Sequence, residues 1–263
     1  MYSNDSRFFY KVNNSLKKLK IPIQVLNFGQ KVRNFDGVVL TTQEEFERLP
    51  DEIQSDKFLV YSDSQDFEEY IMQILATHKF GNNRDYNEII FSIDPGENKT
   101  GVAIFLDEYF FISRIFYDQK KIVSEIKKFI SYFKFRKSDA YKIKIFFGIG
   151  VPSLVESLLD ALTEEFKENP PIFYLVDERK TSKIKHRKKI LNITKHEISA
   201  IWIAIRAIKA LKSVNYFDES IKNNRKQSQK KLNSEIKFDE NLDKEVFLGN
   251  LSISEALERE KLK

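Results

Sequence analysis

The chain has 263 residues, of which 41% are hydrophobic and 32% charged, so it can bury one large core or two modest ones. It contains no cysteine, which excludes disulfides and thiolate metal sites and is usual inside cells. The net charge of +5 favours polyanionic partners only weakly, and no apolar run reaches membrane-spanning length. We therefore expect a cytoplasmic protein without membrane contact. Abundant Lys, Glu and Ile would suit a thermophile.

Residues 1–84 are expected to form a small α/β domain. Short β-like runs cover residues 21–26, 37–40 and 57–61, and helices are predicted to about residue 49 and over 65–78. The first of these helices would be capped by Thr41 or Thr42, with Glu44 and Glu45 in its first turn. Gly and polar residues over 80–85 indicate a linker.

Residues 85–213 are predicted to form the main domain. Strands are expected at 89–94, 101–106, 109–117, 142–147 and 172–176, and helices at 119–134, 153–167 and 196–212. A three-stranded meander followed by alternating helix and strand predicts a mixed sheet flanked by helices. Residues 214–263 are polar and charged, so we expect a partly flexible segment that ends in a short helix.

Asp94 stands where an apolar run ends in a tight Pro-Gly turn, before a second apolar run starts at Gly101. This pattern predicts a β-hairpin with one carboxylate at its mouth. A carboxylate held on a rigid strand can bind a hard divalent cation, although an Asp there can also simply cap the turn.

Two later segments carry further acids. Asp177 and Glu178 end an apolar run, and because successive strand residues face opposite ways, only one of them can join Asp94. Glu197 lies in the first turn of the last long helix, where with Thr194 it could equally form a capping box. His196 precedes it and could act as a ligand or base, although a lone His more often does neither.

A dense basic stretch follows Glu178. Seven of its eleven residues are cationic, which suggests a path for a phosphate backbone, although a solvated loop would look the same. These residues are Arg179, Lys180, Lys183, Lys185, Arg187, Lys188 and Lys189.

Together these segments resemble the RNase H-like fold and, within it, the RuvC and YqgF group of Holliday junction resolvase-like proteins. The first motif of that group is similar to Asp94, Gly96, Thr100 and Gly101. Its later motifs resemble residues 147–152 (FGIGVP), 177–182 (DERKTS) and 197–200 (EISA). The resemblance covers about residues 87–212 and predicts an RNase H-like mixed β-sheet flanked by helices, preceded by the small α/β domain.

The resemblance implies a Mg²⁺- or Mn²⁺-dependent endonuclease that hydrolyses phosphodiester bonds in structured nucleic acid, such as branched DNA junctions. Asp94, Glu178 and Glu197 would then be both the catalytic residues and the ligands of two metals. One metal would activate water and the other would stabilise the leaving oxygen in an in-line attack on the phosphodiester. DNA is favoured over RNA as the partner, and a homodimer is suggested because a junction has two-fold symmetry.

Two departures from the family pattern keep an alternative open. The last motif has Glu197 where the pattern has Asp, and Gly148 falls where RuvC carries an acid on its fourth strand. The alternative is a catalytically inactive RNase H-fold protein that binds nucleic acid or a protein partner. A sugar-kinase or actin-type ATPase also begins with a similar turn, but it needs a second lobe and a second Gly-rich motif, which this sequence lacks.

Overall fold

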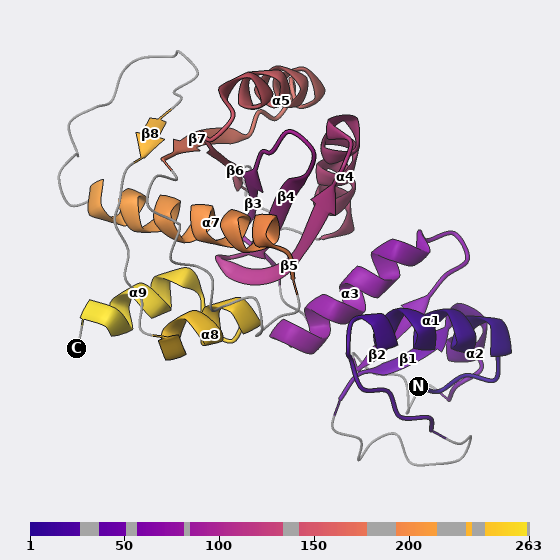
Figure 1. Cartoon of the computed structure of the whole chain (residues 1–263). Helices are drawn as coiled ribbons and strands as arrows, with labels where there is room; N and C mark the ends of the chain where they lie inside the picture. Colours follow the sequence, from indigo (N-terminus) through magenta and orange to yellow (C-terminus); the bar gives the residue numbers. More distant parts are fainter. Residues whose placement is uncertain are drawn as a thin grey trace. The chain divides into compact units, whose positions relative to one another are not determined.

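The computed structural model describes residues 1–26, 37–50, 57–81, 85–133, 142–177, 193–214, 230–232 and 240–261 (Figure 1). The chain divides into two compact units, Met1–Asp85 and Tyr86–Lys263. Among the helices that the structure describes, none combines the length and the hydropathy that crossing a bilayer requires.

The first unit is a small α/β fold. Its elements are α1 (Ser6–Lys18), β1 (Val39–Thr42), α2 (Gln43–Glu47), β2 (Phe58–Tyr61) and α3 (Phe67–Phe80), and β1 pairs with β2 in parallel. Helix α1 was not predicted, and the strand predicted at 21–26 is wrong. That segment has irregular backbone whose hydrogen bonds are isolated, such as Leu26 N–H to the Met1 carbonyl at 2.8 Å, so no strand ladder forms.

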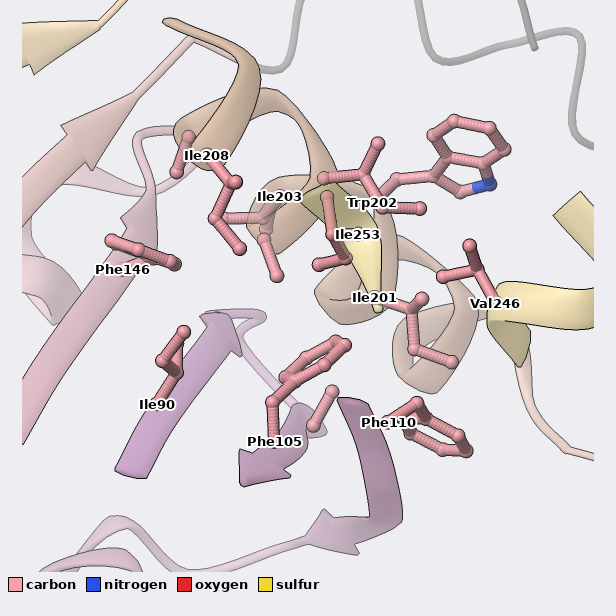
Figure 2. Close-up of a cluster of buried hydrophobic side chains, with 14 of the residues drawn as sticks. Ile90, Phe105, Phe110, Phe146, Ile201, Trp202, Ile203, Ile208, Val246 and Ile253 are labelled. Carbon is pink, nitrogen blue, oxygen red and sulfur yellow. The ribbon is translucent and has the colours of Figure 1, made fainter. Parts of the chain in front are cut away.

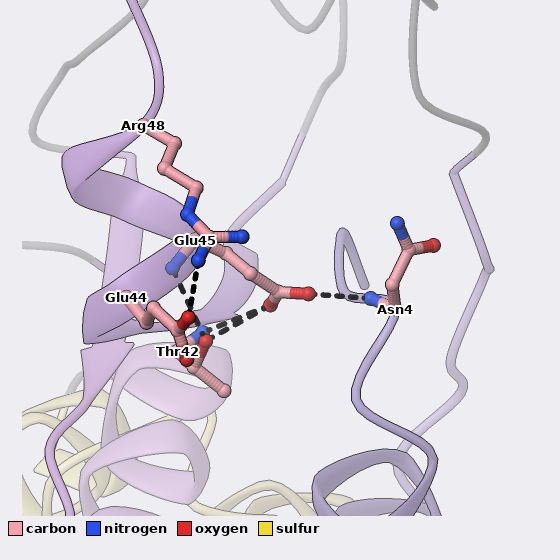
Figure 3. Close-up of polar contacts among 5 residues, drawn as sticks. All are labelled: Asn4, Thr42, Glu44, Glu45 and Arg48. Carbon is pink, nitrogen blue, oxygen red and sulfur yellow. Dashed lines mark hydrogen bonds and ion pairs between the residues drawn. The ribbon is translucent and has the colours of Figure 1, made fainter.

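Helix α2 begins with the predicted capping box. The Thr42 hydroxyl accepts the N–H of Glu45, and the Glu45 carboxylate accepts the N–H of Thr42 in return. The same carboxylate accepts the N–H of Asn4, so it ties the chain's N-terminal segment to the start of α2 (Figure 3). Burial raises the pKa of Glu45, but hydrogen bonds involving Ser3, Asn4 and Thr42 outweigh it and leave the pKa below its usual value.

Glu45→Gln is expected to destabilise α2 by about 1 kcal/mol at neutral pH, because hydrogen bonds to an ionised acceptor are lost. A lowered folded-state pKa adds stability above the unfolded pKa, about 4.3, and this contribution disappears as the pH falls through the folded value. Amide hydrogen exchange over residues 43–47 should therefore separate the variant from wild type at pH 7 and not at acidic pH. Glu44→Gln is the matched control, since Glu44 forms an exposed ion pair with Arg48; an equal effect there would contradict the prediction.

The second unit contains a mixed sheet in the order β5-β4-β3-β6-β7-β8. Strands β5, β4 and β3 form an antiparallel meander, and β6, β7 and the short β8 continue in parallel with β3. The strands are β3 (Glu88–Asp94), β4 (Thr100–Leu106), β5 (Tyr109–Phe116), β6 (Lys142–Gly148), β7 (Ile172–Val176) and β8 (Lys230–Leu232). The meander and the strands β6 and β7 are as predicted, whereas β8 was not predicted.

Helices cover both faces of this sheet, which confirms the predicted mixed sheet flanked by helices (Figure 1). One face carries α4 (Gln119–Tyr132) and α5 (Pro152–Glu165), and the other carries α7 (Lys195–Val214). Side chains alternate between the faces, so that Ile90 and Phe105 pack with Ile203 of α7 (Figure 2), while Phe111 meets Phe129 of α4 on the other face. Asp94 has the same parity as Ile90 and belongs to the α7 face.

The C-terminal residues end in a short helix, as predicted, but α8 and the packing of this segment into the core were not predicted. Residues 240–261 include helices α8 (Glu240–Leu248) and α9 (Ile253–Lys261). Val246, Phe247 and Ile253 are buried in the same core cluster as α7, and Val246, Ile253 and Trp202 are seen in Figure 2. Trp202 packs against Phe247 with ring centroids 6.0 Å apart. A few apolar side chains at helical spacing thus anchor a segment whose average composition is polar. Residues 215–229 and 233–239 lie outside the described part.

Candidate functional site

The candidate site lies at one edge of the sheet of the second unit. Asp94 ends β3, the central strand between β4 and β6, and is only 7% exposed. Because β3, β6 and β7 run in parallel, the ends of all three lie at this edge, with Gly148 and Val176 closing the other two strands. The antiparallel pairing of β4 and β5 brings Thr100 and Phe116 to the same edge. This is the edge at which open α/β sheets place their ligands.

Helix α7 brings His196 to Asp94. The imidazole Nδ1 lies 2.8 Å from Asp94 Oδ2, across 102 positions of sequence. The His196 side chain is 37% exposed and that of Asp94 10%, so the ring stands between the buried carboxylate and the solvent. With Nδ1 engaged by the carboxylate, the Nε2 atom is the one left to donate, accept or bind a cation.

Two glycines make this approach possible. A Cβ on Gly101 would lie 2.2 Å from the His196 carbonyl oxygen and 2.9 Å from the Glu197 nitrogen. A Cβ on Gly96 would lie 2.5 Å from the Lys99 carbonyl oxygen of the same turn and 3.2 Å from Cε1 of the His196 ring, so the turn itself also requires this glycine. The D-x-G and T-G pattern therefore has a structural meaning here, because both glycines leave room for the first turn of α7.

The Glu197 carboxylate reaches away from β3, toward β5. Its Oε1 accepts a hydrogen bond of 2.9 Å from the Ser113 hydroxyl, and its Oε2 accepts the Thr194 N–H at 2.8 Å. The Glu197 N–H donates to Thr194 Oγ1 at 3.4 Å, which completes a capping box at the start of α7. Glu197 therefore fixes the helix start. Each of its oxygens keeps a further lone pair with which it could bind a cation.

The end of β7 is held by α7. Arg206, which is buried, donates from Nη1 to the Asp177 carbonyl oxygen at 3.1 Å. This bond fixes Asp177, the first residue of the predicted 177–182 motif and the last described residue of this segment. Glu178 and the seven basic residues from Arg179 to Lys189 lie outside the described residues.

The structure brings His196, rather than another predicted acid, into contact with Asp94. The Glu197 carboxylate is held by Ser113 and Thr194, so the convergence of Asp94 with Glu178 and Glu197 stays a prediction. Within the described part of the chain, no three His, Asp or Glu side chains gather in a way that could hold a metal ion.

The contacts of His196 and Ser113 were not foreseen from the sequence. His196 had one signal, its place between a capping Thr and an acid at the start of a helix, but nothing in the sequence pairs it with Asp94. Ser113 had none. Comparison with known proteins adds no assignment, because no protein-family model matches this chain and a search of curated proteins finds no relative.

Proposed function

We propose that this chain has an RNase H-like fold and is a metal-dependent nuclease that hydrolyses phosphodiester bonds in structured nucleic acid, DNA in preference to RNA. The observation that carries the proposal is the buried Asp94 at the end of the central strand, with His196 of α7 hydrogen-bonded to it and Glu197 next to His196 in the first turn of the same helix. The meander and parallel strands support the RNase H-like fold because they follow the order of elements that the resemblance implies.

The residues fit a hard divalent cation by their donor chemistry. Asp94 and Glu197 offer carboxylate oxygens, and Mg²⁺ commonly takes one or two carboxylates while phosphate and water supply its remaining ligands. Asp94 would be the central ligand, with Glu178 and Glu197 as the proposed others. The cation, when bound, would supply an activated water and neutralise charge on the phosphate.

Each of these residues has a distinct role in the proposed site. Asp94 holds its charge on a rigid strand, and His196 both orients that carboxylate and covers it from solvent. Glu197 keeps the first turn of α7 in place through Thr194 and Ser113. The basic residues from Arg179 to Lys189 would bind the phosphate backbone. A homodimer, which the resemblance suggests, would set two such sites on one junction.

The test is a cleavage panel with single-stranded, duplex, RNA–DNA hybrid and four-way junction substrates. We expect cleavage of at least one structured substrate in Mg²⁺ or Mn²⁺ and none with EDTA. If no substrate is cut in either metal, the nuclease proposal is wrong. The alternative would then stand: an inactive RNase H-fold protein that binds nucleic acid or a protein partner, as Gly148 at the end of β6 and the hydrogen-bonded Glu197 would favour.

His196→Gln is expected to reduce cleavage by about tenfold to a hundredfold, the range typical when a residue that orients a ligand is removed. Glutamine keeps a polar side chain of similar length but cannot reproduce the ring's hydrogen bond to Asp94. The rate on the best substrate of the panel measures the effect, and Lys195→Gln, the exposed neighbour on α7, is the control. Equal rates for both variants and wild type would exclude a role for the ring.

A further inference from the structure

An exposed aromatic side chain stands at the same edge of the sheet as Asp94. Tyr117 directly follows β5 and is 75% exposed, the most of any large hydrophobic residue that the structure describes. Lys99, in the turn between β3 and β4, places its ammonium 5.3 Å from the centroid of the Tyr117 ring. Leaving an aromatic ring exposed to water is unfavourable compared with burying it.

Strand register fixes where this pair lies. Thr100 pairs with Phe116, so Lys99 and Tyr117 are the next residues outward on adjacent strands. Asp94 pairs with Gly101 on the other side of β4. Tyr117 is therefore two strands away from Asp94 and two residues further outward, about 12 Å at the usual strand dimensions.

We propose that Tyr117 and Lys99 form a nucleotide subsite, in which an unpaired base stacks on the Tyr117 ring and Lys99 binds an adjacent phosphate. This inference rests on the proposed function, since it names the substrate class of the same site. Aromatic rings stack on bases of any sequence, and a neighbouring cation meets the backbone charge. The nearby acid Asp118 is occupied as the cap of α4, where it accepts the Lys120 N–H at 3.0 Å.

The spacing defines the substrate further. A stacked strand advances about 3.4 Å per nucleotide, so a base on Tyr117 lies about three to four nucleotides from a phosphate at Asp94. A base paired inside a blunt duplex cannot present its face to the ring. The preferred substrate is therefore nucleic acid with unpaired nucleotides beside the cleaved bond: a single strand, a flap or an opened junction.

The experiment compares variants in an Asp94→Asn background, in which the ligand stays intact. Fluorescence anisotropy measures binding of a single-stranded DNA oligonucleotide and of a copy with abasic residues, which keeps the phosphates and lacks the bases. Tyr117→Ala should weaken binding of the ordinary strand about tenfold and leave the abasic strand nearly unchanged. Tyr117→Phe should restore binding. Tyr10→Ala, at a 68% exposed tyrosine of the other unit, is the matched control and should have no effect.

Lys99→Gln should weaken both strands and reduce the slope of log affinity against log salt by about 0.7, as expected for one lost phosphate contact on a single strand. If wild type binds the ordinary strand and Tyr117→Ala binds it equally well, the subsite is wrong while the proposed function stands. If Tyr117→Ala weakens the ordinary and abasic strands alike, base stacking is likewise excluded. If the Asp94→Asn protein binds no nucleic acid at all, the proposed function falls and the subsite with it, and the exposed pair is better explained as a protein contact.

Discussion

Asp94→Asn is expected to lower cleavage of the best substrate at least about a hundredfold and to leave the stability of the fold almost unchanged. The substitution keeps the shape of the side chain and an oxygen within reach of His196, but it removes the charge that a divalent cation needs. General acid–base and metal-activated steps each account for factors of this size or more. The single-turnover rate in saturating Mg²⁺ measures the effect.

The control for this variant is Ser92→Ala, two residues earlier on the same face of β3. Ser92 is fully buried, and within the described residues its hydroxyl has no hydrogen-bond partner, so removing it should cost no stability and no activity. Undiminished cleavage by Asp94→Asn would remove the central residue of the proposed site. Loss of cleavage by both variants would show that the strand, rather than the carboxylate, is sensitive.

The main strands and helix α7 could be predicted from the sequence because the patterns that indicate them are local. The runs that became β3 and β4 are apolar from residue 89 to 93 and from 101 to 106 apart from Ser92, as expected for strands covered on both faces. The Pro-Gly turn between them admits only a tight connection. Helix α7 has an apolar face broad enough to predict it without tertiary information.

The helices that sequence reasoning missed have weaker local signals. Helix α1 buries only Phe8, Val12 and Leu16, one residue per turn, among polar neighbours. Helix α8 is short, and its average composition is that of a solvated terminus, whereas α9 corresponds to the short helix that was predicted at the end of the segment. In each case the helix is stabilised mainly by tertiary packing of a few side chains, which average composition does not reveal.

Only part of the candidate site could be predicted from the sequence, for a related reason. Asp94 and Glu197 could be chosen because each stands at the end of an element. The hydrogen bonds from His196 to Asp94 and from Ser113 to Glu197 join residues 102 and 84 positions apart, and no periodicity encodes such contacts. Whether Glu178 joins them stays a prediction, which a metal-binding titration of Glu178→Gln against wild type would test.

Gly101→Ala is expected to destabilise the second unit by about 3 kcal/mol and to abolish activity through the displaced helix start. The added methyl would lie 2.2 Å from the His196 carbonyl oxygen and 2.4 Å from its carbon, and both are backbone atoms that no rotamer change can move. Overpacking a well-packed core costs about 1–3 kcal/mol, and a clash with backbone belongs at the upper end. Fluorescence of Trp202 on α7, the chain's one tryptophan, reports unfolding of this unit in urea.

Gly81→Ala is the control that distinguishes the effect of this clash from the loss of a glycine's backbone freedom. Gly81 has a φ of +86°, and a Cβ added there would meet no described atom within 4 Å. Alanine at this position should therefore destabilise the first unit through backbone strain alone, by about 1–2 kcal/mol. Its Trp202 transition should match that of wild type, while Gly101→Ala shifts to lower urea. An unshifted Gly101→Ala transition would mean that α7 does not start against β4. The contact between His196 and Asp94 would then lose its structural basis, since Gly101 is what lets the helix approach the strand end.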